Sequence, residues 1–96
     1  MKIKLEIINL TLDDCNILVP RINLIKDKIY PKLKVEYTLF KKNTNSIRIN
    51  QEINDNDTAL TLFNLFNNLN FNQKGKNKIQ FHCSLNNNIT EYGKEE

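Results

Sequence analysis

The chain has 96 residues, of which 40% are hydrophobic and 26% are charged, and its formal net charge is +3 at pH 7. This length supports one domain with a two-layer core, and the composition excludes a wholly disordered chain. No apolar run approaches the roughly 20 residues of a membrane-spanning helix. The first residues alternate between polar and apolar side chains and lack the apolar core of a signal peptide. We therefore expect a cytoplasmic protein with no membrane partner.

The first predicted element is a strand. From Lys2 to Asn9, apolar and polar side chains alternate, which is typical of a half-buried strand. Thr11 and Asp14 then have the spacing of a helix cap. Residues 12–19 are expected to form a turn or a short helical piece.

The main helix of the first half is expected to begin at Pro20, because proline suits the first turn of a helix. Tyr30-Pro31 should end it, since the residue before a proline disfavours helix. Alternation then predicts a strand over residues 32–40, a polar and basic turn over 41–45, and a second strand over 46–53.

Residues 54–57 are rich in N-cap residues and introduce a second helix that reaches Leu69. The helix is amphipathic. Its expected buried side consists of Ala59, Leu62, Phe63, Leu65, Phe66 and Leu69. Its expected outward side consists of Thr61, Asn64, Asn67 and Asn68. A loop over 72–77, a strand over 78–85 and a short strand over 89–92 complete the pattern.

The predicted fold class is therefore an α/β domain of the two-layer α+β type. Its order is β-α-β-β-α-β with a possible C-terminal β-hairpin, and two helices pack on one face of a mixed sheet. This single domain spans residues 1–92, and residues 93–96 form a charged tail.

The cysteines do not form a complete reactive or metal-binding motif. Cys15, with Pro20 after it, resembles the second half of a thioredoxin active site, and the residues before Cys15 resemble the loop of heavy-metal-associated domains. In both cases Leu12 stands where the first cysteine should be, although thiol exchange and soft-metal binding need the pair. His82 and Cys83 are adjacent, so on a strand they point to opposite faces. We therefore expect no enzyme, no metal site and no cofactor.

Basic residues gather at three places along the chain. Lys41 and Lys42 share one turn, Arg48 lies on the polar side of a strand, and a glycine-containing loop carries the remaining cluster of Lys74, Lys76 and Lys78. Neutralising nucleic-acid phosphates requires such clusters, although solvated loops also carry lysines. These six residues are the candidate RNA-binding residues.

A specific order of features runs from Ser46 to Tyr92. A strand ends at Glu52-Ile53, a capped helix with spaced leucines follows, and a hairpin with a polar turn begins at Lys78. This order resembles the eukaryotic large-subunit ribosomal protein family twenty-two, in a divergent and shortened form. The first-half elements also run in the family's order.

This resemblance implies a structural constituent of the cytosolic large ribosomal subunit. It would bind ribosomal RNA (rRNA) by backbone and shape recognition, with rRNA and neighbouring ribosomal proteins as partners and no small-molecule substrate. The family's second helix is rich in Lys and Arg, whereas the outward positions here are largely Thr and Asn. The loop lysines and Arg48 would then make more of the phosphate contacts.

Two alternatives use other features of the chain. A redox-inactive thioredoxin-like scaffold domain in a larger, organellar assembly would explain Cys15 and Pro20, and it would end at the helix near Leu69. A ferredoxin-like protein-binding module is the third possibility. The ribosomal interpretation instead needs residues 78–92 as an integral hairpin.

Overall fold

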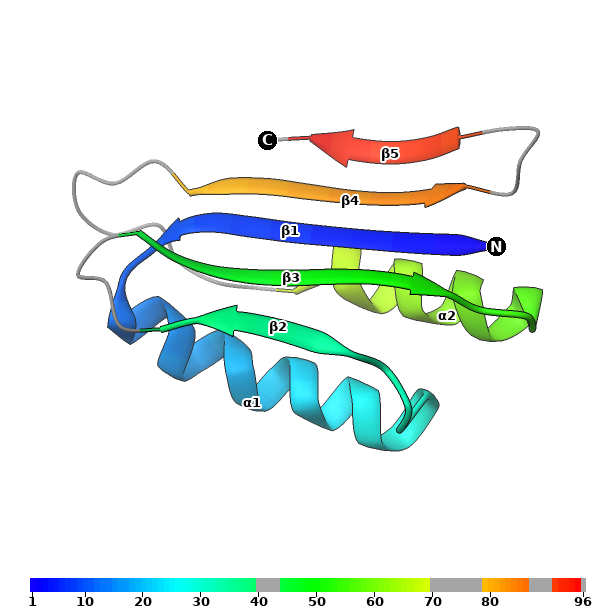
Figure 1. The fold of residues 1–96 in the computed structure, drawn as a ribbon, viewed down its shortest axis with the longest axis horizontal. Coiled ribbons are helices and arrows are strands. Elements are labelled where there is room, and N and C mark those ends of the chain that lie inside the picture. The colour runs from blue at the N-terminus through cyan, green and yellow to red at the C-terminus, as the bar shows by residue number, and fades with distance from the viewer. Residues whose placement is uncertain (40–43, 70–78, 87–90, 96) are drawn as a thin grey trace.

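The computed structural model describes residues 1–39, 44–69 and 79–86, and the backbone of residues 91–95. Five strands and two helices occur in this part of the chain, in the order β1, α1, β2, β3, α2, β4, β5. The sheet order is β2-β3-β1-β4-β5, and both helices cover the same face of the sheet (Figure 1). The predicted α+β class, element order and two-layer arrangement are confirmed.

The predicted mixed sheet is wrong in one respect, because every strand pairing is antiparallel. Strands β1 and β2 are joined through α1 but have β3 between them, and β3 and β4 are joined through α2 but have β1 between them. The crossover connections therefore link strands that are not neighbours, and the inserted strand runs the other way. This is the split β-α-β arrangement seen in ferredoxin-like topologies.

β1 (Lys2–Leu10) forms the centre of the sheet. Its side chains alternate as predicted: Ile3, Leu5 and Ile7 are buried beneath the helices, and the intervening residues are exposed. The alternation ends in a β-bulge between Ile7 and Leu10, where Asn9 has a φ of 63°. This left-handed conformation is one that asparagine tolerates better than most residues.

A buried asparagine holds the end of this bulge. The side chain of Asn45 is fully buried, and its Nδ2 donates a hydrogen bond to the carbonyl oxygen of Leu10 over 2.9 Å. A buried amide is costly unless it is hydrogen-bonded, so this contact offsets the loss of water on both groups.

α1 (Leu12–Ile29) is one continuous helix, so the prediction that the main helix begins at Pro20 is wrong. Thr11 and Asp14 form a complete capping box, with Asp14 N–H donating to Thr11 Oγ1 over 3.1 Å. Pro20 lies inside the helix and faces solvent. An interior proline costs about 3 kcal/mol, but buried Leu18 and Ile22 lie on both sides of it and stabilise the helix by about 1.5–3 kcal/mol each. The helix ends at Tyr30, as predicted.

The next strands form an antiparallel hairpin at one edge of the sheet. β2 (Val35–Thr38) is shorter than predicted, and β3 (Asn45–Glu52) agrees with the predicted strand to within one residue at each end. Tyr37 Oη donates a hydrogen bond to Asn23 Oδ1 of α1 over 2.9 Å, which attaches this edge to the helical layer.

α2 (Asn56–Asn67) begins after the N-cap residue Asp55, whose side chain accepts a hydrogen bond from Asp57 N–H. Its buried side chains are Ala59, Leu62 and Phe66. The expected burial of Leu65 is wrong, since this side chain is 37% exposed.

β4 (Gln80–Asn86) places Phe81, Cys83 and Leu85 in the core, as predicted. β5 (Glu91–Glu95) pairs with β4, so the hairpin is present but lies later in the chain than expected. Residues 93–95, which were predicted as part of a loose tail, belong to this strand.

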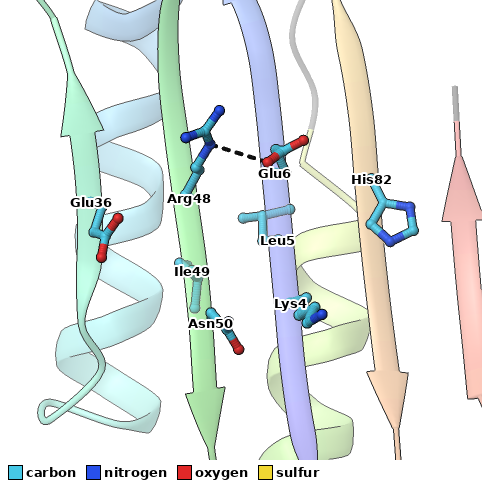
Figure 2. A pocket seen from close by; sticks show the side chains of 8 residues that line it. All are labelled: Lys4, Leu5, Glu6, Glu36, Arg48, Ile49, Asn50 and His82. Carbon is cyan, nitrogen blue, oxygen red and sulfur yellow. Dashed lines mark ion pairs between the residues drawn. The ribbon is translucent and has the colours of Figure 1, made fainter.

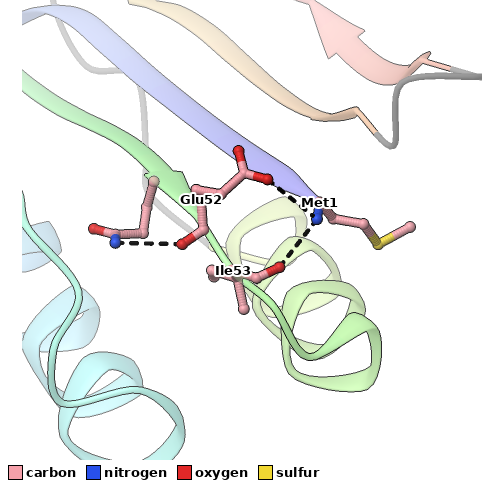
Figure 3. Close-up of polar contacts among 4 residues, drawn as sticks. Met1, Glu52 and Ile53 are labelled. Atoms are coloured by element: carbon pink, nitrogen blue, oxygen red, sulfur yellow. Dashed lines mark hydrogen bonds and ion pairs between the residues drawn. The ribbon is translucent and has the colours of Figure 1, made fainter.

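The N-terminal amine closes the far end of the β1–β3 ladder (Figure 3). The ammonium of Met1 donates to the carbonyl oxygen of Ile53 over 3.0 Å and lies 3.6 Å from Glu52 Oε1. The backbone N–H of Ile53 donates in return to the Met1 carbonyl over 2.8 Å. Beside this pair, Gln51 Nε2 donates to the Glu52 carbonyl over 3.4 Å.

Candidate nucleic-acid interface

Of the six predicted RNA-binding residues, Arg48 is the one that the structure describes. Lys41, Lys42, Lys74, Lys76 and Lys78 lie outside the described residues. The described residues that flank the two lysine-bearing segments can nevertheless be placed in the sheet.

The strands that follow the two lysine-bearing segments begin at the same end of the sheet. Asn45, at the start of β3, pairs with Leu10 on one side of β1, and Gln80, at the start of β4, pairs with Ile8 on the other side. The starts of β3 and β4, which follow residues 40–43 and 70–78 in sequence, therefore lie at the end of the sheet where β1 finishes (Figure 1). The sequence alone does not show that these two strand starts lie at one end, because it does not reveal the strand order.

Arg48 lies on the open face of the sheet, opposite the helices. It belongs to a row that crosses four strands in register: Glu36 pairs with Arg48, Arg48 with Glu6, and Glu6 with His82. Figure 2 shows these four side chains on adjacent strands. The Nε of Arg48 lies 3.1 Å from Oε2 of Glu6, and the two side chains are 56% and 49% exposed. Such an exposed ion pair is worth at most about 1 kcal/mol.

The row crosses a shallow depression of about 400 Å³ on the open face. Its lining residues are Lys4, Leu5, Glu6, Glu36, Arg48, Ile49, Asn50 and His82 (Figure 2). Positive and negative side chains are mixed, and only His82 among these eight carries a ring. The lining of this depression therefore lacks the aromatic row on which RNA-binding sheets stack bases.

The exposed side chains of α2 include Thr and Asn together with Leu60 and Leu65, and the last turn carries no positive charge. Thr61, Asn64 and Asn68 are exposed, as predicted. Asn67 is only half-exposed, and its Oδ1 is buried without a hydrogen-bond partner in the described part of the chain. The outward residues can offer hydrogen bonds to phosphate or sugar, but they cannot neutralise phosphates.

Both cysteines face the core. Burial raises the pKa of the Cys15 thiol, and the neighbouring Asp14 carboxylate raises it further. Burial raises the pKa of Cys83 to about 12. A thiol must ionise to act as a nucleophile or a metal ligand, so both side chains are poorly suited to either role at neutral pH.

The described residues do not provide a set of donor side chains for a bound metal ion. His82 points to the open face and Cys83 to the core, as the strand geometry predicts. Within residues 1–39, 44–69 and 79–86, no three His, Cys, Asp or Glu side chains form a group that could hold a metal ion.

The chain matches no family model, no curated protein and no solved structure. Neither of the described helices has the length and apolar character needed to cross a membrane.

Sequence analysis did not identify the carboxylates beside Arg48. Alternation correctly placed Glu6 on a polar face, but the pairing of Glu6 and Glu36 with Arg48 depends on strand order and register. One signal was present: all three residues occupy outward positions of predicted strands, so an antiparallel pairing would put opposite charges on one face.

Proposed function

We propose that this protein is a structural constituent of the cytosolic large ribosomal subunit and binds folded rRNA through its backbone and shape. The lysines at positions 41, 42, 74, 76 and 78 make the phosphate contacts. Duplex RNA is generally recognised in this way, because its deep major groove is closed to side chains.

The supporting observation is the position of the strand starts that follow the two basic segments. The strands that follow them, β3 and β4, start on either side of β1 at the same end of the sheet. Five lysines precede these two strand starts in sequence, and we propose that one phosphate backbone is contacted by both segments at once. Multiple contacts of this kind release counterions and supply sequence-independent affinity.

The C-terminal hairpin adds support. The resemblance to ribosomal family twenty-two needs residues 78–92 as an integral part of the fold, and β4 lies between β1 and β5 in the sheet. A thioredoxin-like domain that ends near Leu69 would lack this strand. The buried Cys15 with its raised pKa is compatible with either a ribosomal protein or a redox-inactive scaffold, so strand β4 is the feature that argues against the scaffold alternative.

The first test is a titration of the purified protein with a structured RNA hairpin and a matched DNA duplex at several salt concentrations. We expect tighter binding to RNA, and a linear fall of log affinity with log salt. Absence of RNA binding at the lowest salt would contradict the proposal.

A matched pair of variants locates the interface. Lys41→Glu/Lys42→Glu should reduce affinity for every RNA sequence alike and make the salt slope less steep by about 1–2. The control, Lys28→Glu/Lys32→Glu, reverses the same number of charges near the α1–β2 turn, at the opposite end of the sheet (Figure 1). Equal losses from both variants would indicate a net-charge effect without a defined interface.

Membership of the subunit needs a separate measurement. A tagged copy expressed in its own cells should sediment with the large ribosomal subunit and dissociate at high salt. Sedimentation as a free protein would contradict a structural role in the ribosome, whatever its affinity for RNA.

A further inference from the structure

The open face of the sheet contains an arginine with a carboxylate on each neighbouring strand. Arg48 on β3 lies directly opposite Glu6 on β1 and opposite Glu36 on β2. Side chains at directly opposed positions of neighbouring strands lie about 4.5–5.5 Å apart at Cβ, close enough to interact. Arg48 therefore has a carboxylate on each side.

One of these carboxylates is in contact with the guanidinium. Glu6 Oε2 lies 3.1 Å from Arg48 Nε, within hydrogen-bonding distance. The group of one arginine and two glutamates has a net charge of −1. A phosphate that approaches Arg48 would compete with Glu6 for the guanidinium and would also be repelled by Glu36 (Figure 2). Arg48 is therefore poorly placed as a phosphate contact, although its residue type and exposure suggest one.

We infer that Glu6 and Glu36 exclude RNA phosphates from Arg48, so that RNA is confined to the end of the sheet and kept off its open face. This inference rests on the proposed RNA-binding function. Glu6 is the specificity-determining residue, because it is the carboxylate in contact with the guanidinium. Lys4 and Asn50 in the adjacent row would be available to a phosphate backbone only if this exclusion were lifted.

The test compares four proteins by titration with the structured RNA hairpin at several salt concentrations: wild type, Arg48→Gln, Glu6→Gln, and the double variant. Arg48→Gln should bind like wild type. Glu6→Gln should bind about threefold to fivefold tighter and have a salt slope steeper by about 0.7–0.9, because it gains one phosphate contact. The double variant should return to the wild-type affinity, because the new contact needs the arginine.

Asp27→Asn provides the matched control. Asp27 is exposed on α1, in the helical layer, and its neutralisation raises the net charge by the same single unit as Glu6→Gln. An equal gain from both variants would show a general charge effect and overturn the inference. Thermal unfolding of each variant checks that the fold is unchanged.

The remaining outcomes separate this inference from the proposed function. Weaker binding by Arg48→Gln, with a slope less steep by about one, would show that Arg48 already contacts phosphate, and would overturn only the inference. Glu6→Gln binding like wild type would do the same. A wild-type protein that binds no RNA at the lowest salt would overturn the proposed function and the inference with it.

Discussion

The two faces of the sheet differ in what determines them. On the covered face, Ile3, Leu5 and Ile7 are buried because each strand alternates by itself and the helices supply the second layer. On the open face, the charged surroundings of Arg48 are set by Glu6 and Glu36, which belong to two other strands. The covered face is therefore a property of local pattern, whereas the open face is a property of strand order and register.

The largest expected effect comes from the covered side. Phe66 of α2 is fully buried, and Phe66→Ala should lower the free energy of unfolding by about 3–5 kcal/mol, because it removes apolar contacts and leaves a cavity. Urea unfolding followed by circular dichroism measures this change. Leu60→Ala, at a position that is 42% exposed on the same helix, should cost much less. Similar losses at both positions would contradict the assignment of the faces.

A polar residue within the buried side is the next test. Asn45→Ala removes the hydrogen bond to the Leu10 carbonyl and should lower the free energy of unfolding by about 1–3 kcal/mol. Asn50→Ala, on the exposed side of the same strand, is the control and should change stability by less than about 0.5 kcal/mol. The same urea titration compares them, and an unchanged midpoint for Asn45→Ala would mean that the bulge does not need this contact.

The buried thiol predicts a specific pH dependence. The pKa of Cys83 is raised from 9.0 to about 12, so the folded state disfavours ionisation that the unfolded chain undergoes. Its contribution to stability is complete below pH 9 and is lost as the pH rises toward 12, by about 1 kcal/mol between pH 9 and 10. Cys83→Ala should show a shallower decline over this interval in denaturant titrations. Parallel declines for the two proteins would contradict the burial of the thiol.

The smallest effect is expected on the open face. Arg48→Gln breaks an exposed ion pair and should change the free energy of unfolding by less than about 1 kcal/mol, with a still smaller change in high salt. Thermal unfolding at low and high salt provides the measurement. A loss comparable to that of Phe66→Ala would show that the two faces contribute equally to stability.

The same distinction explains how far the sequence predicts this molecule. Alternation and caps predicted the element order, the buried positions of β1 and β4, and the capping box of Thr11 with Asp14. Pro20 misled the prediction of α1, because a local helix-start preference is overridden by the burial of Leu18 and Ile22 on both sides of the proline.

Other features depended on contacts between segments far apart in the chain. The antiparallel sheet follows from strand insertion, and the hydrogen bond from Asn45 to Leu10 at the end of the bulge joins residues 35 positions apart. For the candidate interface, residue type alone identified Arg48 but could not reveal that Glu6 and Glu36 lie beside it. Strand order was also needed to place the strand starts that follow the two basic segments at one end of the sheet.

The central position of β1 affects how the protein folds during its synthesis. β1 is made before the other described strands, yet its Lys2 pairs with Glu52 of β3 on one side and with Asn86 of β4 on the other. During synthesis β1 therefore cannot pair until β3 and then β4 have been made. Non-local pairings of this kind slow folding and leave strand edges exposed to other molecules. A nascent chain arrested before β4 would carry its central strand as an open edge, so we expect such chains to aggregate or to need a chaperone.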